Sequence, residues 1–319
     1  KLKRFAGRAI KIVFSIYNIS KKQRIMTALL DVLVNEKNIT LEKILSAFLQ
    51  AYGAVGVKFA QILSSQPEIE RDLPKLHKEL SKLKDEANPM SISEAMKAIM
   101  RNPELRSKNI KIIKPIGSAS IKGVFLAEID GKKKVIKVRR VDANKNLRKE
   151  ENEFKHIMDE LVAPLREIFD INNLPDYSKR IFIGLKEEID FAREIENSNR
   201  LRQILALETN DKVSFSTPKI DENLSDNNVI VEEYCEGQSY PDFKNKASKK
   251  EQDLVEKKLQ KISINEIFKY DFWHADKHDG NIFIDQKNGK LIINFIDNGL
   301  CGKKKKKKNK QLLQNIILQ

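Results

Sequence analysis

The residues best suited to chemistry lie between positions 274 and 299, where acidic and amide side chains follow in a fixed order. His274, Asp276 and Asn281 form the pattern H-x-D-x-x-x-x-N, and Asp297 opens a D-x-G pattern after an apolar hairpin-like stretch. A nucleoside triphosphate needs a divalent cation to neutralise its phosphates, and Mg²⁺ prefers oxygen ligands. Asn281 and Asp297 would supply such oxygens, and Asp276 would orient or deprotonate the attacking group. The segment therefore predicts phosphoryl-transfer chemistry.

This order is also the one in which kinase-like folds present their phosphoryl-transfer residues. Upstream, Lys137 lies in a strand-like stretch whose alternation puts Ile136 and Val138 on one face and the lysine on the other. A lysine at this position in such folds reaches the α- and β-phosphates. A turn of small residues, whose backbone amides could approach phosphate, comes before it. The residues of this turn are Gly117, Ser118, Ala119 and Ser120.

The elements that must position these groups follow from a change of hydrophobic period along the chain. Helical spacing predicts helices at residues 23–35, 41–65, 73–86, 91–102, 144–169, 176–208 and 248–269. Ser91 and Glu94 form a capping box at the start of the fourth of these. β-Branched and alternating stretches predict strands at residues 110–116, 121–129, 135–138, 212–219, 228–234, 282–285 and 290–296. Asp130-Gly131 predicts a tight hairpin turn.

These elements predict an α+β protein with an atypical protein-kinase-like two-lobe fold and nucleotide in the cleft between the lobes. We expect an N-terminal helical extension at residues 1–108, an N-lobe with inserted helices at residues 109–236, and a partial C-lobe with a basic tail at residues 237–319. Because so little sequence follows Gly299, a truncated C-terminal lobe is expected, with reduced stability or completion by another chain. The first residue is Lys rather than Met, which indicates a fragment or a processed product.

Composition narrows the class of protein. The formal net charge is +15, and a lysine run near residue 305 contributes to it. Such a charge favours anionic partners, for example nucleotide phosphates or acidic lipid headgroups. No basic stripe with interleaved aromatic residues and no nucleic-acid motif accompanies it, so nucleic acid is not expected as a partner. No apolar run approaches the ~18 residues of a membrane span, so a transmembrane segment is not expected.

Three smaller features concern a membrane surface, the two thiols and a pair of histidines. Residues 1–16 form a basic amphipathic segment that either lies on an anionic membrane or packs on a core as a first helix. Cys235 and Cys301 lack metal-ligand spacing and are expected to be free thiols of a reducing compartment. The spacing of His274 and His278 resembles a zinc pair, but Gly280 argues against a helix there.

Four short motifs carry a specific family resemblance. They are the Gly-Ser-Ala-Ser turn at residues 117–120, K-x-A-Q from Lys58 to Gln61, E-x-D at Glu188 and Asp190 followed by Glu194 and Asn197, and H-A-D-x-H-x-G-N at residues 274–281. On these residues, from about position 53 to 299, the chain resembles the UbiB (AarF-like) family of atypical kinase-like proteins. That family is associated with coenzyme Q biosynthesis and isoprenoid-lipid homeostasis.

The resemblance implies roles for individual residues. The implied catalytic residues are Asp276, Lys137, its helix partner Glu194, and Lys58 and Gln61 on a helical lid over the cleft. The implied nucleotide-binding residues are Gly117, Ser118, Ala119, Ser120, Lys137, Glu188 and Asp190, and the implied metal ligands are Asn281 and Asp297. Taken without the family, Lys58 and Gln61 read as the polar face of a helix.

The chain departs from the family pattern at four positions. Ala60 stands where the lid motif has glycine, which adds a methyl group in a close helix contact. Asn298 replaces the aromatic residue of D-F-G, which bears on the control of an active conformation. Lys277 and Asp279 replace prolines of the catalytic loop, so a less rigid loop is expected.

The resemblance implies a Mg²⁺-dependent, ATP-binding atypical kinase or ATPase that supports ubiquinone or isoprenoid-lipid metabolism. Its partners would be nucleotide, anionic membrane lipids or isoprenoid and quinone precursors, and a biosynthetic protein complex. It would be peripherally membrane-associated on the cytoplasmic or organelle-matrix side. The alternative is a non-catalytic pseudokinase that binds nucleotide or lipid as a scaffold. A small-molecule phosphotransferase ranks lower, because such enzymes lack the K-x-x-Q and E-x-D segments.

Overall fold

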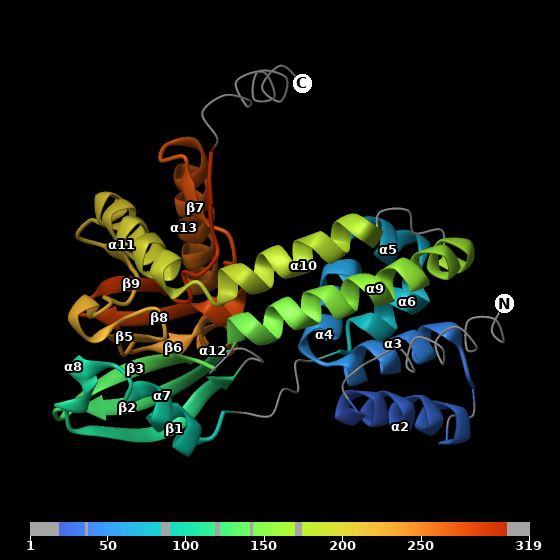
Figure 1. The fold of residues 1–319 in the computed structure, drawn as a ribbon. Helices are drawn as coiled ribbons and strands as arrows, with labels where there is room; N and C mark the ends of the chain where they lie inside the picture. Colours follow the sequence, from blue (N-terminus) through green and yellow to red (C-terminus); the bar gives the residue numbers. More distant parts are fainter. Residues whose placement is uncertain are drawn as a thin grey trace. The chain divides into compact units, whose positions relative to one another are not determined.

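The computed structural model describes residues 19–35, 38–83, 90–118, 122–140, 143–169 and 174–304. Its contacts divide the chain into two compact units (Figure 1). The first, here called the helical unit, contains Lys1–Ser91, Ser118–Gly123 and Arg140–Ile189. The second, here called the mixed unit, contains Ile92–Gly117, Val124–Arg139 and Asp190–Gln319. The three-part division predicted at residues 108 and 236 stays a prediction.

The helical unit is built around one aromatic cluster. Its helices are α2 (Ile19–Asn35), α3 (Leu41–Tyr52), α4 (Ala54–Ser64), α5 (Pro67–Asp72), α6 (Pro74–Leu80), α9 (Ala143–Phe169) and α10 (Leu174–Glu188). Phe154 of α9 is fully buried and meets the rings of Tyr52, Phe59 and Phe182 with centroid distances of 5.3, 5.6 and 5.9 Å. Figure 1 shows α9 and α10 running side by side. Helices from distant parts of the sequence therefore share one core.

Two of the predicted helices are each divided in the structure. The segment at residues 41–65 forms α3 and α4, because Gly53 between them has φ of 102°, which L side chains rarely adopt. The segment at residues 176–208 forms α10 and α11 (Phe191–Glu208). Asp190 starts the second of these by accepting a hydrogen bond from the backbone N–H of Arg193. Local capping therefore overrides the continuous apolar period.

Gly56 is expected to be the least replaceable glycine of the helical unit. A Cβ built there would lie 2.2 Å from the carbonyl oxygen of Leu49, so Gly56→Ala must push α3 and α4 apart. We expect a loss of about 1–3 kcal/mol in the free energy of unfolding, measured by urea titration. Gly184→Ala on α10 is the matched control, because nothing lies within 4 Å of its Cβ position. That variant should gain about 0.5–1 kcal/mol, and equal effects at the two positions would contradict the close approach.

Three sheets are seen in the described part of the mixed unit. The first has the order β1 (Ile110–Ser118), β2 (Lys122–Ile129), β3 (Lys132–Arg139) and β5 (Val229–Glu233). The second has the order β4 (Val213–Ser216), β9 (Lys290–Phe295), β8 (Ile282–Lys287) and β6 (Gln238–Ser239). A third pairs β10 (Cys301–Lys303) with β7 (Phe272–His274). The turn between β2 and β3 has positive φ at Asp130 and Gly131, as the hairpin prediction requires.

Helices α11, α12 (Tyr240–Lys246) and α13 (Lys249–Phe268) contribute to a second core in the mixed unit. The same unit also contains α7 (Ile92–Ile99), which contacts β3, and α8 (Pro103–Arg106). The stacked rings of Phe215 and Phe295 are part of the second core. The segment from His274 to Asp297 runs through it, so the predicted catalytic pattern is anchored to buried strands.

Several predictions made from the sequence concern the ends of the chain and the thiols. The amphipathic segment at residues 1–16 and the lysine run from residue 305 lie outside the described residues. None of the helices within the described ranges has the length and apolar character needed to cross a bilayer. Cys235 and Cys301 are free thiols, as predicted. Burial raises the pKa of each to about 12, so both are protonated at neutral pH.

Candidate functional site

A cavity of about 370 Å³ lies in the mixed unit beside β3 and β5. Among its lining residues are Gly117, Lys137, Asn281 and Asp297, which were predicted at the nucleotide or the metal. Apolar side chains complete the wall, and they are Ile116, Val124, Val135, Phe283 and Ile296. A cavity of this size with a few convergent polar groups is typical of a small-molecule site.

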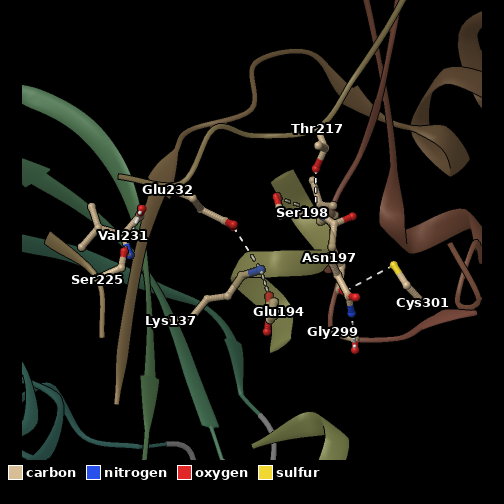
Figure 2. A network of polar contacts seen from close by, with 12 residues as sticks. Lys137, Glu194, Asn197, Ser198, Thr217, Ser225, Val231, Glu232, Gly299 and Cys301 are labelled. Carbon is tan, nitrogen blue, oxygen red and sulfur yellow. Dashed lines mark hydrogen bonds and ion pairs between the residues drawn. The ribbon is translucent and has the colours of Figure 1, made fainter. Parts of the chain in front are cut away.

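Lys137 extends from β3 into a group of carboxylates (Figure 2). Its Nζ lies 2.6 Å from Oε1 of Glu194 on α11 and 3.2 Å from Oε1 of Glu232 on β5. Ile136 and Val138 are fully buried on the opposite face of β3, as strand alternation predicts. The predicted Lys137–Glu194 pair is therefore present, while its catalytic role stays a prediction.

Burial and the nearby carboxylates have opposite effects on the pKa of Lys137. Burial alone would lower the pKa of Lys137, but the carboxylates of Glu194, Glu232 and Asp297 outweigh it and raise that pKa. The ammonium therefore stays charged. Burial raises the pKa of Glu232, and the nearby Lys137 only partly offsets this. Sequence reasoning missed Glu232, although a charged residue after the apolar run Val229–Val231 was a usable signal.

His274 ties the loop at residues 274–281 to the residue after β9. Its Nδ1 accepts a hydrogen bond from the backbone N–H of Asp276 at 3.1 Å, so the proton is on Nε2, which lies 3.1 Å from the carbonyl oxygen of Ile296. Burial lowers the pKa of His274, which keeps the ring neutral. The ring thus fixes the backbone beside Asp276 against the residue before Asp297.

Asn281 faces Asp276 across the same loop. Its Nδ2 donates to the carbonyl oxygen of Asp276 at 3.0 Å and lies 3.4 Å from Asp276 Oδ2. In this orientation the amide nitrogen bonds to the protein, and the amide oxygen is the atom predicted to bind a cation. Asp297 has φ of 59°, an uncommon conformation for a non-glycine residue. Strained backbone of this kind clusters at ligand sites.

Asn298 is held by hydrogen bonds rather than by aromatic packing. Its Nδ2 donates to Thr217 Oγ1 at 2.6 Å and to Ser198 Oγ at 3.2 Å. Asn197 in turn donates from Nδ2 to the carbonyl oxygens of Asn298 at 3.1 Å and Gly299 at 3.3 Å. Figure 2 shows these side chains converging from α11 and from the segment after β4. The amide nitrogen of the asparagine that replaces the family's aromatic residue is therefore satisfied, whereas its Oδ1 is buried with no hydrogen-bond partner among the described residues.

Two ion pairs hold the loop at residues 274–281 at the positions where the family has prolines. Lys277 Nζ lies 2.5 Å from Oε2 of Glu266, which is fully buried on α13 and also accepts from the backbone N–H of His274 at 3.1 Å. Lys244 Nζ lies 2.5 Å from Oδ2 of Asp279. Sequence reasoning expected a less rigid loop at these positions and missed both ion pairs, because each partner lies on a different helix.

The remaining predicted residues lie in the helical unit or at its boundary. Lys58 Nζ forms an ion pair with Oε1 of Glu188 at 2.5 Å, and Gln61 is exposed on α4. Both belong to the helical unit, and their predicted place over the cavity stays a prediction. Asp190 is the N-cap of α11, and its predicted approach to the metal stays a prediction too. Ala119 and Ser120 lie outside the described residues, as does the side chain of Ser118.

The residues present fit a Mg²⁺–nucleotide complex. Asn281 and Asp297 offer amide and carboxylate oxygens on one cavity wall. Among the described residues, no group of three or more His, Cys, Asp or Glu side chains is placed to hold a metal ion. A cation held by the oxygens of Asn281 and Asp297 would complete its shell with ligand phosphates and water, which is how Mg²⁺ is commonly held.

A family model described as the ABC1 atypical kinase-like domain matches residues 82–319. The chain belongs to this family. The predicted resemblance and the predicted α+β kinase-like fold are therefore confirmed.

Curated relatives of the ABC1 chain cover most of its length. It is 28% identical over 289 residues to an uncharacterized protein in the hydrogenase 1 5′ region of Clostridium pasteurianum, covering 86% of this chain and 50% of that protein. It is 25% identical over 290 residues to a probable protein kinase UbiB of Aliivibrio fischeri, covering 87% and 51%. The chain spans about half the length of the curated relatives it matches.

A solved structure has a related fold. It is the complex of Rv3197 with erythromycin from Mycobacterium tuberculosis, with a TM-score of 0.52, 18% sequence identity, and coverage of 88% of this chain and 68% of that one. At this identity the likeness concerns the fold alone.

Proposed function

We propose that this ABC1-family chain is a Mg²⁺-dependent, ATP-binding atypical kinase or ATPase. The observation that carries the proposal is that buried Lys137, paired with Glu194, lines the same cavity as Asn281 and Asp297. Phosphoryl transfer depends chiefly on positioning and on stabilising negative charge. This cavity offers both an ammonium for phosphate and oxygens for the cation.

Each residue would have a definite task. The apolar wall formed by Val124, Val135 and Ile296 would accept the nucleobase. Lys137, held by Glu194, would donate to the phosphate oxygens, and Asp276 would orient the attacking group or accept its proton. Bound Mg²⁺, held by Asn281 and Asp297, would neutralise charge on the transferred phosphoryl group. His274 contributes by fixing the backbone between these two loops.

The metabolic role and the partners are proposed from the family. We propose that the activity supports ubiquinone or isoprenoid-lipid metabolism at a membrane surface, with anionic lipids, isoprenoid or quinone precursors, or a biosynthetic complex as partners. Support comes from relatives named probable protein kinase UbiB and from the basic composition of the chain. A peripheral place on the cytoplasmic or organelle-matrix side of the membrane is part of this proposal.

A nucleotide-binding scaffold without turnover is the second candidate. It is favoured by Glu232, which shares Lys137 with Glu194, and by Asn298 in place of the family's aromatic residue. The two candidates differ in hydrolysis or transfer of phosphate, not in binding.

The first test is thermal unfolding of the chain with ATP or ADP, with and without Mg²⁺. Binding to the folded state alone adds about 2.7 kcal/mol of stability at a hundredfold excess over the dissociation constant. We expect a Mg²⁺-dependent rise in Tm that Asp297→Ala removes. The control Asp253→Ala changes an acidic residue of α13 whose side chain is about half exposed, and it should keep the rise. If wild type shows no rise with either nucleotide, the nucleotide site is refuted.

Phosphate release then separates enzyme from scaffold. If the chain is an enzyme, wild type should release phosphate from ATP. Asp276→Asn should then abolish this release and keep the Mg²⁺-dependent rise in Tm. Binding without any turnover in wild type would favour the scaffold.

A further inference from the structure

Glu232 lines the cavity and contacts Lys137, although none of the predicted motifs contains it. It is 4% exposed, is the residue before the last in β5, and is paired in register with Val135 of β3. That register places its carboxylate 3.2 Å from Lys137 Nζ, while Glu194 lies at 2.6 Å from the same atom. Figure 2 shows the ammonium between the two carboxylates.

The second carboxylate is not needed to neutralise Lys137. Glu194 already balances its charge, so Glu232 adds a buried negative charge that has no second cation of its own among the groups acting on it. Burying a carboxylate in this way costs free energy, and burial indeed raises the pKa of Glu232. A residue that opposes folding at a ligand cavity is a candidate for a functional role.

The excess charge has a direct consequence for an anionic ligand. Lys137 has three N–H donors and two carboxylate partners here, so one donor can serve a phosphate oxygen. That oxygen would approach the carboxylates of Glu194, Glu232 and Asp297 at the same time. A metal-free nucleotide meets net repulsion there, whereas a divalent cation brings compensating charge with the phosphates.

We propose that Glu232 is a specificity-determining residue that makes this site select nucleotides complexed with a divalent cation over metal-free nucleotides. The inference rests on the proposed nucleotide-binding function. Glu232 acts by sharing Lys137 and by keeping the cavity wall negative.

The test is the affinity for ATP, measured by calorimetry with Mg²⁺ and separately with EDTA. In Glu232→Gln we expect metal-free ATP to bind about tenfold tighter than in wild type, because one like charge beside the phosphates is removed. The affinity for Mg²⁺–ATP should change less. The ratio of the affinity for Mg²⁺–ATP to the affinity for metal-free ATP is therefore expected to fall. Glu236→Gln is the matched control, because Glu236 is exposed and pairs with Lys287. Its ratio should equal that of wild type.

Each outcome separates this inference from the function on which it rests. If wild type binds no nucleotide in either condition, the proposed function fails first. If wild type binds Mg²⁺–ATP and Glu232→Gln leaves the ratio unchanged, the role of Glu232 is refuted. A variant that loses Mg²⁺–ATP selectively would instead show that Glu232 binds the cation, which also overturns the proposal. Glu232→Met serves as a second variant if the amide does not fold, with the same expected fall in the ratio.

Discussion

Replacing Lys277 with methionine is expected to lower the free energy of unfolding by about 3–5 kcal/mol, since it breaks a buried ion pair by removing one partner. Glu266 has no solvent exposure, and only its Oε2 atom has hydrogen-bond partners among the described residues, namely Lys277 and the backbone of His274. Lys277 also lies over the ring of Phe295, with Nζ 4.9 Å from the centroid. Urea titration at neutral pH measures the loss.

The control for Lys277 is a lysine in an exposed pair. Lys287→Met removes an ion pair with Glu236 in which both side chains are more than half exposed, and it should cost less than about 1 kcal/mol. The double variant Lys277→Met with Glu266→Leu should recover much of the loss, because no uncompensated charge remains. Equal losses for Lys277→Met and Lys287→Met would contradict the role of the buried pair.

Lys137→Met is expected to have the second large effect, again about 3–5 kcal/mol at neutral pH, and to abolish the rise in Tm with Mg²⁺–ATP. The substitution leaves Glu194 and Glu232 buried together without their shared ammonium. Adding Glu232→Gln to the variant should restore part of the stability but not the nucleotide-dependent rise. A variant as stable as wild type would show that the carboxylates do not depend on Lys137.

The stability of the Lys137→Met variant should also depend on pH. Burial raises the pKa of Glu232 above its usual 4.5, and Lys137 acts to lower it, so removing Lys137 raises it further. A carboxyl group whose pKa is higher in the folded than in the unfolded state stabilises the folded protein when it is protonated. This contribution is fully present below pH 4.5 and is lost as the pH rises through the pKa of Glu232 in the folded state. The deficit relative to wild type should therefore grow between pH 4.5 and 8. Urea titrations of both proteins across this range measure it.

The sequence by itself determined the features that depend on neighbouring residues. Strand alternation placed Lys137 opposite Ile136 and Val138, and the turn at Asp130 and Gly131 closed the hairpin as expected. Motif order predicted the family and the kinase-like fold, because the spacing of ligating groups along a loop is a local property. Helix ends were less predictable. The apolar period continues from α3 into α4, although the helix itself is broken at Gly53.

Only the tertiary structure decided which distant residues complete the site. Glu232 meets Lys137 because β3 pairs with β5 in one register, and a shift by one residue would turn Glu232 away from the lysine. Glu266 reaches Lys277 from α13, and Thr217 reaches Asn298 across 81 positions of sequence. No local period encodes such pairs, because side chains far apart in sequence meet only after sheets and helices have packed. The charges that hold Lys137 and the catalytic loop are therefore a property of the fold.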